Sequence, residues 1–167
     1  VYSLGNAGWQ QQAKVSAEPA YADDTLGGTV ALKNHMAMLG VMRRDDKGED
    51  AGAVFAFERE ANSWSQKQVL TAIDAKAGDA FGQSIALTAR FLVIGAPQSD
   101  TPHKDSGSAY VYVREKDTWQ FQAKLTAKDG AAGDLFGISV AIDGDTVLVG
   151  ADLNDEQAEK AGAVYAY

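Results

Sequence analysis

A repeat of 55 residues is the feature that most constrains the fold of this chain. Its only three tryptophans, Trp9, Trp64 and Trp119, are 55 residues apart, and no insertion breaks the register. Three periods account for 165 of the 167 residues. We therefore expect one repeat region over 1–167, with repeats at about 9–63, 64–118 and 119–167 and residues 1–8 as the tail of a preceding repeat. In such chains each copy forms one supersecondary unit.

Within a copy, apolar residues alternate with polar ones, which predicts β-strands. Every second side chain from Trp119 to Ala127 is apolar, and the residues between them are Gln, Lys and Thr. The triplet Asp143-Gly144-Asp145 is typical of a tight hairpin turn. No segment shows convincing helical spacing, so the predicted fold class is all-β. In the first copy we expect antiparallel strands near 26–33, 36–41, 52–59 and 64–72.

Four short strands in about 50 residues, separated by glycines, are typical of one blade of a β-propeller. The string AGDLFGISVA at residues 132–141, followed by VLVGA at 147–151 and GAVY at 162–165, resembles the FG-GAP repeat of integrin alpha-subunit propellers and their bacterial relatives. Residues 78–84 and 93–97 match this pattern in the second copy. The resemblance implies that the Ser84 and Ser139 segments are innermost strands and that the Trp segments are outermost.

The first copy departs from the FG-GAP pattern. It has Leu26-Gly27-Gly28 in place of the Phe-Gly pair, and Gly40-Val41-Met42 in place of Gly-Ala-Pro. The local geometry of this copy is therefore expected to differ from that of the other two.

The number of strands predicts open ends. A propeller closes with about four to eight blades, so three repeats are part of a larger or assembled propeller. We expect residues 9–17 to form an outer strand that pairs with a strand outside residues 18–167. The expected partners are other blades, from the same longer chain or from a second copy, and the isolated chain should self-associate through its edges.

The resemblance also raises the question of calcium, because integrin-like blades carry an Asp-x-Asp-x-Asp-Gly-x-x-Asp loop between their first two strands. The corresponding connections here, 33–35, 88–90 and 143–145, are too short to surround Ca²⁺. The chain thus resembles the bacterial type without the calcium loop, and we expect no Ca²⁺ at Asp143 or Asp145. No cofactor is expected. If an ion binds, we expect Ca²⁺ in the longer loops, at Asp100 and Asp105 or at Asp152 and Asp155; otherwise these acidic loops are simply solvated.

Asp24, Asp79 and Asp134 recur two residues before the Phe-Gly position and could be read as catalytic carboxylates. An Asp before a tight turn commonly accepts backbone N–H bonds, and its return in each copy suits a fastening between blades. We therefore favour a structural role for these three residues.

The aromatic positions could form a sugar-stacking platform, but their recurrence on one strand face favours a core between blades. His35 and His103 are isolated, and neither Ser84 nor Ser139 has a histidine at a matching register. The chain has no cysteine and no phosphate-binding Gly-rich loop. We therefore expect a protein that is not an enzyme.

Charge narrows the range of partners. The formal net charge is -8 and no basic cluster is longer than Arg43-Arg44, which disfavours nucleic acid. The apolar stretches are far shorter than the roughly 20 residues that cross a bilayer, so no membrane insertion is expected.

These observations favour an adhesion or binding module outside the cell or at its surface, with the periplasm as an alternative location. It would recognise a protein or glycan ligand through its loops. Two alternatives stay open. One is a structural subunit that pairs strands between chains, and the other is an accessory propeller of a larger secreted enzyme.

Overall fold

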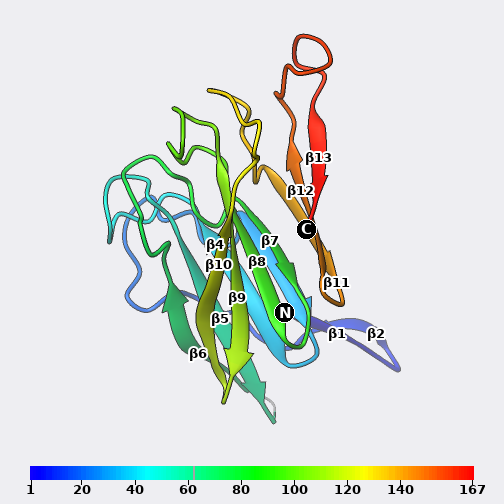
Figure 1. Ribbon diagram of the computed structural model, residues 1–167. Helices are drawn as coiled ribbons and strands as arrows, with labels where there is room; N and C mark the ends of the chain where they lie inside the picture. The colour runs from blue at the N-terminus through cyan, green and yellow to red at the C-terminus, as the bar shows by residue number, and fades with distance from the viewer. Residues whose placement is uncertain (62) are drawn as a thin grey trace.

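A computed structural model describes residues 1–61 and 63–167, and this part of the chain folds into thirteen β-strands without a helix (Figure 1). The strands are β1 Tyr2–Gly5, β2 Gly8–Gln11, β3 Thr29–Lys33, β4 Met36–Val41, β5 Ala53–Glu60, β6 Ser63–Leu70, β7 Ser84–Leu87, β8 Phe91–Ala96, β9 Ser108–Glu115, β10 Thr118–Leu125, β11 Ser139–Asp143, β12 Thr146–Ala151 and β13 Ala163–Ala166. In the described ranges, no helix has the length and apolarity needed to cross a membrane.

The strands form separate antiparallel sheets in the orders β3-β4-β5-β6, β7-β8-β9-β10 and β11-β12-β13, and β1 pairs with β2 as a hairpin. This confirms the all-β prediction and the four strands expected in the first sheet. The first strand begins at Thr29 and not at residue 26, because residues 24–28 form a turn. The fourth strand of each complete sheet begins the next sequence repeat.

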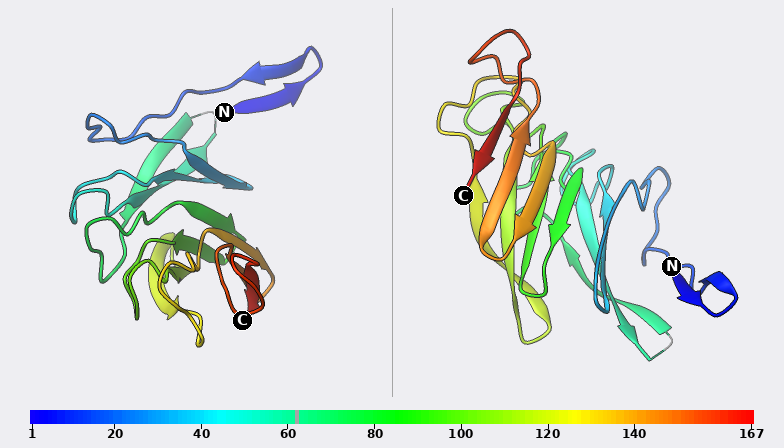
Figure 2. Two further views of the ribbon diagram at one scale, coloured as in Figure 1. Left: turned by 90° about the horizontal axis from the view of Figure 1, so that it is seen from above. Right: turned by 90° about the vertical axis from the view of Figure 1, so that its right-hand side faces the viewer.

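The sheets stand side by side in a fan, with β11–β13 at one end and the β1–β2 hairpin projecting from the other (Figure 2). Strand β7 lies against both β3 and β11. The first strands of the sheets therefore converge on one side, as the resemblance implied for the innermost strands. The sheets do not close into a ring.

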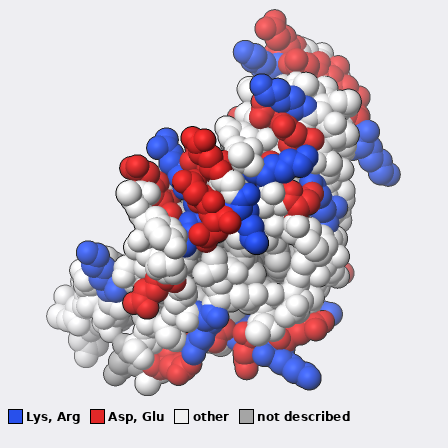
Figure 3. Space-filling model, turned by 90° about the vertical axis from the view of Figure 1, so that its left-hand side faces the viewer, with Lys and Arg blue, Asp and Glu red and all other residues white. Residues whose placement is uncertain are grey.

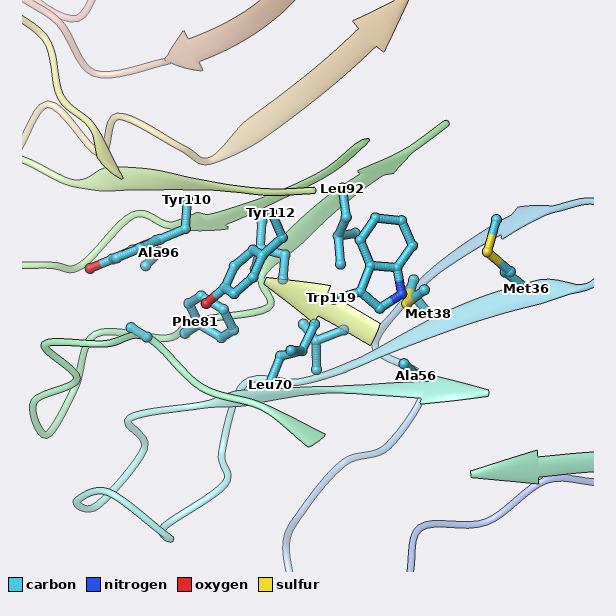
Figure 4. Packing of buried hydrophobic residues seen from close by; sticks show 13 residues of the cluster. Met36, Met38, Ala56, Leu70, Phe81, Leu92, Ala96, Tyr110, Tyr112 and Trp119 are labelled. Atoms are coloured by element: carbon cyan, nitrogen blue, oxygen red, sulfur yellow. The ribbon is translucent and has the colours of Figure 1, made fainter. Parts of the chain in front are cut away.

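Alternation along the strands sends side chains to the two faces of each sheet and builds a core between neighbours. In the second sheet, Leu92 and Ile94 face the first sheet, whereas Val93 between them faces the third. Figure 4 shows the first of these cores, where Phe81, Tyr112 and other side chains of the two sheets point into one space. Each core is therefore shared by two sheets.

The three tryptophans differ in burial. Trp119 is buried in the core between the first two sheets, and Trp64 packs against the core of the first sheet. Trp9 is 71% exposed. The expectation that these positions form a core between blades is confirmed for Trp119 but is wrong for Trp9, because its hairpin projects away from the sheets.

The prediction of a strand at residues 9–17 holds for only part of that segment. Strand β2 pairs with β1 of the same chain, so the pairing of this segment with another blade stays a prediction. Residues 12–17 are not a strand. They leave the hairpin and cross to the first sheet, where Val15 and Ala17 pack against its core.

Candidate binding surface

Three long loops leave the second strands of the sheets at one common end of the fan, the upper end in Figure 1. We call residues 42–52, 97–107 and 152–162 the long loops. Each is closed by an aspartate that accepts a hydrogen bond from the backbone N–H five residues later. The bonds are Asp50 N to Asp45 Oδ1 at 2.8 Å, Asp105 N to Asp100 Oδ1 at 3.0 Å and Lys160 N to Asp155 Oδ1 at 2.5 Å.

The residue that donates each of these bonds has a left-handed backbone, with φ of 52° at Asp50, Asp105 and Lys160. Residues other than glycine adopt this conformation only when their surroundings hold them there. The closing aspartate supplies part of that restraint, so the three long loops are closed in the same way.

The candidate metal ligands lie in the second and third long loops. Asp100 and Asp105 are brought together by the bond between the Asp105 N–H and the Asp100 carboxylate. Asp155 closes its own loop in the same way, and Asp152 is exposed near its start. Within residues 1–61 and 63–167, no three Asp, Glu, His or Cys side chains gather as metal ligands would. Calcium binding in these loops stays a prediction.

A second set of segments lies beside the long loops. We call residues 24–28, 79–83 and 134–138 the docking turns. Their first residues, Asp24, Asp79 and Asp134, are buried. Each carboxylate accepts a backbone N–H from three residues earlier, Tyr21 at 2.8 Å, Lys76 at 2.8 Å and Ala131 at 2.9 Å. This confirms the prediction that these aspartates accept backbone N–H bonds before the turn.

The residue twenty positions after each of these aspartates was missed in the sequence. Arg44 is buried, donates to Asp24 at 2.8 Å and lies 4.2 Å from the ring centre of Tyr21. Asn154 donates to Asp134 at 3.0 Å. The constant spacing was the available signal. The residue at this spacing is arginine, serine or asparagine in the three copies. These side chains differ in charge and size, so residue type alone did not identify the position.

Burial of the Asp79 carboxylate lowers the stability of the folded protein at neutral pH. Desolvation raises the pKa of this carboxyl group above its ordinary value. Ionised Asp79 is therefore less favourable in the folded than in the unfolded protein. This penalty is present above the folded pKa and absent below the unfolded pKa of about 3.9.

We expect the Asp79→Asn variant to be more stable than the parent at pH 7, because asparagine keeps an acceptor for the Lys76 N–H without the charge. The difference should shrink toward zero below about pH 4. Urea unfolding at pH 7 and pH 3 measures it, with the exposed Asp145→Asn as a control for the change in net charge. A variant less stable than the parent at pH 7 would contradict this expectation.

The docking turns join neighbouring sheets through backbone hydrogen bonds. Three N–H groups, one from the glycine just before the second docking turn and two from the turn itself, donate to carbonyls of the first long loop: Gly78 to Glu49 at 2.8 Å, Ala80 to Asp50 at 3.2 Å and Phe81 to Ala51 at 3.0 Å. The next interface repeats this pattern with Gly133 to Lys104 at 3.0 Å, Leu135 to Asp105 at 3.2 Å and Phe136 to Ser106 at 3.0 Å. The sheets are thus linked by backbone contacts, and Phe81 and Phe136 are fully buried beside them.

Glycines make this close approach possible. Gly52 and Gly107 bridge to Phe81 and Phe136 with φ of 85°. A Cβ atom at Gly52 would lie 2.6 Å from the backbone nitrogen of Phe81, which is shorter than real contacts allow. A side chain at either glycine would therefore force the two sheets apart.

A second contact joins the first strands to the next docking turn. The Ser84 hydroxyl donates to the Gly137 carbonyl at 2.7 Å, and the Thr29 hydroxyl donates to the Gln83 carbonyl at 2.7 Å. The Gly137 carbonyl fills the space where Gly95 lacks a side chain. Each complete interface thus holds one docking turn in a socket made by the preceding sheet.

Comparison with known proteins agrees with this arrangement. A family model for the FG-GAP repeat matches residues 9–57, 64–112 and 119–167. No curated protein matches the chain. Each matched segment contains a docking turn and a long loop, and together the matches cover most of the sequence. The chain therefore belongs to the FG-GAP repeat family.

Proposed function

We propose that this chain is a non-catalytic binding module that acts outside the cell or at its surface and recognises a protein or glycan through the tips of its long loops. FG-GAP repeats suggest a propeller-type binding module. Loops held on a rigid sheet scaffold are the usual place for recognition in such proteins.

One observation carries this proposal: the long loops are closed in the same way but differ in the side chains at their tips. All three have the closing aspartate and the left-handed residue five positions later. Between these positions the sequences are Asp-Lys-Gly-Glu, Thr-Pro-His-Lys and Glu-Gln-Ala-Glu. Loops that are held closed and present different side chains give specificity, and their closure lowers the entropy cost of binding.

The charge of the molecule limits the kind of ligand. Acidic and basic side chains are intermingled on the face shown in Figure 3, and the net charge is -8. Long-range electrostatics therefore favours a neutral or basic ligand and opposes nucleic acid.

The absence of catalysis is part of the proposal, and the positions of the histidines support it. His35 lies in the β3–β4 turn and His103 in the second long loop, and these segments leave the sheets at opposite ends. Asp24, Asp79 and Asp134 are engaged with the backbone of their own turns.

Binding can be tested on a glycan array and with a displayed library of random peptides, using the 167-residue chain. We expect ligands that lose at least tenfold in affinity when His103 and Lys104 are both replaced by alanine. The control replaces Lys116 and Asp117 by alanine in the β9–β10 hairpin, at the opposite end of the sheet, and should change affinity less than twofold. Failure of both screens to give a ligand with a Kd below about 100 µM, or equal loss in both variants, would refute the proposal.

A further inference from the structure

The third sheet carries another copy of the socket that holds docking turns. In the two complete interfaces, three consecutive carbonyls of the long loop accept N–H groups from the docking turn and from the glycine just before it. Glu159, Lys160 and Ala161 occupy the matched positions in the third long loop. These residues are exposed, and in the described part of the chain their carbonyls accept no hydrogen bond.

The outward face of the third sheet is apolar and exposed where the same face of the second sheet is buried. Leu148 is 43% exposed, whereas Val93 at the matched position is 0% exposed. Val164 is 71% exposed, whereas Ala109 at the matched position is 0% exposed. The difference arises because a docking turn and its sheet cover the second sheet but not the third.

The third socket is already formed. Ser139, Gly150 and Gly162 line a pocket on this face, and they match Ser84, Gly95 and Gly107 of the second sheet. The Ser139 hydroxyl lies beside Gly150 as the Ser84 hydroxyl lies beside Gly95, where it donates to the carbonyl of the next docking turn. Ser139 is therefore placed to donate to an incoming carbonyl.

The first docking turn, residues 24–28, provides the complementary part. Within its own sheet it is built like the others, since the Gly27 N–H donates to the Gly40 carbonyl at 3.2 Å as Gly82 does to Gly95 at 3.0 Å. Leu26 of this turn lines an apolar pocket on the outer side of the first sheet, together with Val30 and Leu32 of β3. Val30 and Leu32 are each 64% exposed, whereas the matched residues of the second sheet pack into a core.

We propose that the first docking turn of one copy inserts into the Ser139–Gly150–Gly162 socket of a second copy, so that the chains associate head to tail. Leu26 takes the place that Phe81 and Phe136 occupy in the internal interfaces. The contact joins two different surfaces, so it leaves a free docking turn at one end and a free socket at the other.

Strand pairing between the two copies would add to the same contact, and the register of β5 with β6 shows which residues would pair. In the first sheet, β5 pairs with β6 through Val54 with Leu70 and Ala56 with Gln68. The matched positions in the third sheet are Val164 and Ala166 of β13, and those in the incoming copy are Val15 and Ala13. Residues 13–15, which form no strand within their own chain, thus become the fourth strand beside β13. The register also puts Val1 and Tyr2 at the positions of Ala166 and Tyr167. Val1 is bonded to Ala13 in its own chain, where its ammonium donates to the Ala13 carbonyl at 2.7 Å, so Val1 and Tyr2 must move aside when residues 13–15 pair with β13.

Sedimentation velocity of the 167-residue chain between about 1 and 100 µM tests the proposal. We expect reversible association that is stronger at 500 mM than at 50 mM NaCl, because each copy carries a net charge of -8. Val164→Arg in the socket face and Leu32→Arg in the docking face should each weaken association at least tenfold. Ile73→Arg is the control, because Ile73 is 72% exposed and lies outside both faces.

Mixing distinguishes head-to-tail association from other modes. The Val164→Arg chain keeps a working docking turn and the Leu32→Arg chain keeps a working socket. Each alone should be monomeric, and an equimolar mixture should form a dimer that grows no further. Circular dichroism melts matching the parent confirm that both variants fold, and Leu148→Arg replaces Val164→Arg if that variant does not. A parent monomeric at 100 µM in both salts, a mixture that stays monomeric, or equal weakening by Ile73→Arg would overturn the proposal. None of these outcomes depends on ligand binding.

Discussion

Replacing Phe81 by alanine is expected to lower the free energy of unfolding by about 3–5 kcal/mol, the usual cost of deleting a fully buried aromatic side chain. Phe81 is 0% exposed and packs edge-on against Tyr110 and Tyr112, with ring centres 5.4 and 6.4 Å away. The substitution leaves a cavity between the first two sheets. Urea denaturation followed by tryptophan fluorescence measures the loss.

Leu26→Ala is the matched control, because Leu26 occupies the same position in the first docking turn but is only partly buried. It should cost less than about 1.5 kcal/mol, since less apolar surface is removed from contact. Equal costs for the two substitutions would show that the docking position does not depend on burial between sheets.

Replacing Gly107 by alanine is expected to destabilise the protein by about 2–5 kcal/mol. The left-handed backbone, with φ of 85°, contributes about 1–2 kcal/mol for a residue with a Cβ atom. Overlap adds about 1–3 kcal/mol, because that atom would lie 2.5 Å from the backbone nitrogen of Phe136. Denaturant unfolding measures the total.

Gly162→Ala separates these two contributions. Gly162 has a φ of 75°, but the nearest atom to an added Cβ is 3.1 Å away, at the carbonyl of Asp152. This variant should lose the backbone contribution of about 1–2 kcal/mol and little more, because the Asp152 carbonyl has to give way by only a few tenths of an ångström. If Gly107→Ala cost no more than Gly162→Ala, the close approach at Phe136 would not be a tight contact.

Much of the fold was predictable because the repeat and the alternation act together. The alternation around Trp119 identified a strand, and the constant spacing transferred that assignment to the other copies. The first docking turn was not predictable in this way: alternation predicts a strand from residue 26, yet residues 26–28 belong to the turn that begins at Asp24. Turn and strand boundaries depend on hydrogen bonds to a neighbouring sheet, which the pattern of apolar residues does not report.

The candidate site was less predictable. The role of Asp79 followed from its place before a glycine turn. Asp100 and Asp155 were considered as metal ligands, but both close their loops by accepting a backbone N–H. The partner residue adopts its left-handed φ only in the folded loop, so the side chains alone could not show this. The sockets themselves consist mainly of backbone carbonyls, which every sequence contains.

The offset between sheet and repeat has a consequence for how such a chain can grow. The outer strand of each complete sheet, β6 or β10, begins the following sequence repeat. A duplicated repeat therefore supplies the missing edge of the unit before it and leaves its own edge to be supplied by the next. In the folded protein, copies added in this way are joined to their neighbours by a shared sheet as well as by the chain. Gene duplication could lengthen the array one unit at a time while every internal joint kept the same geometry.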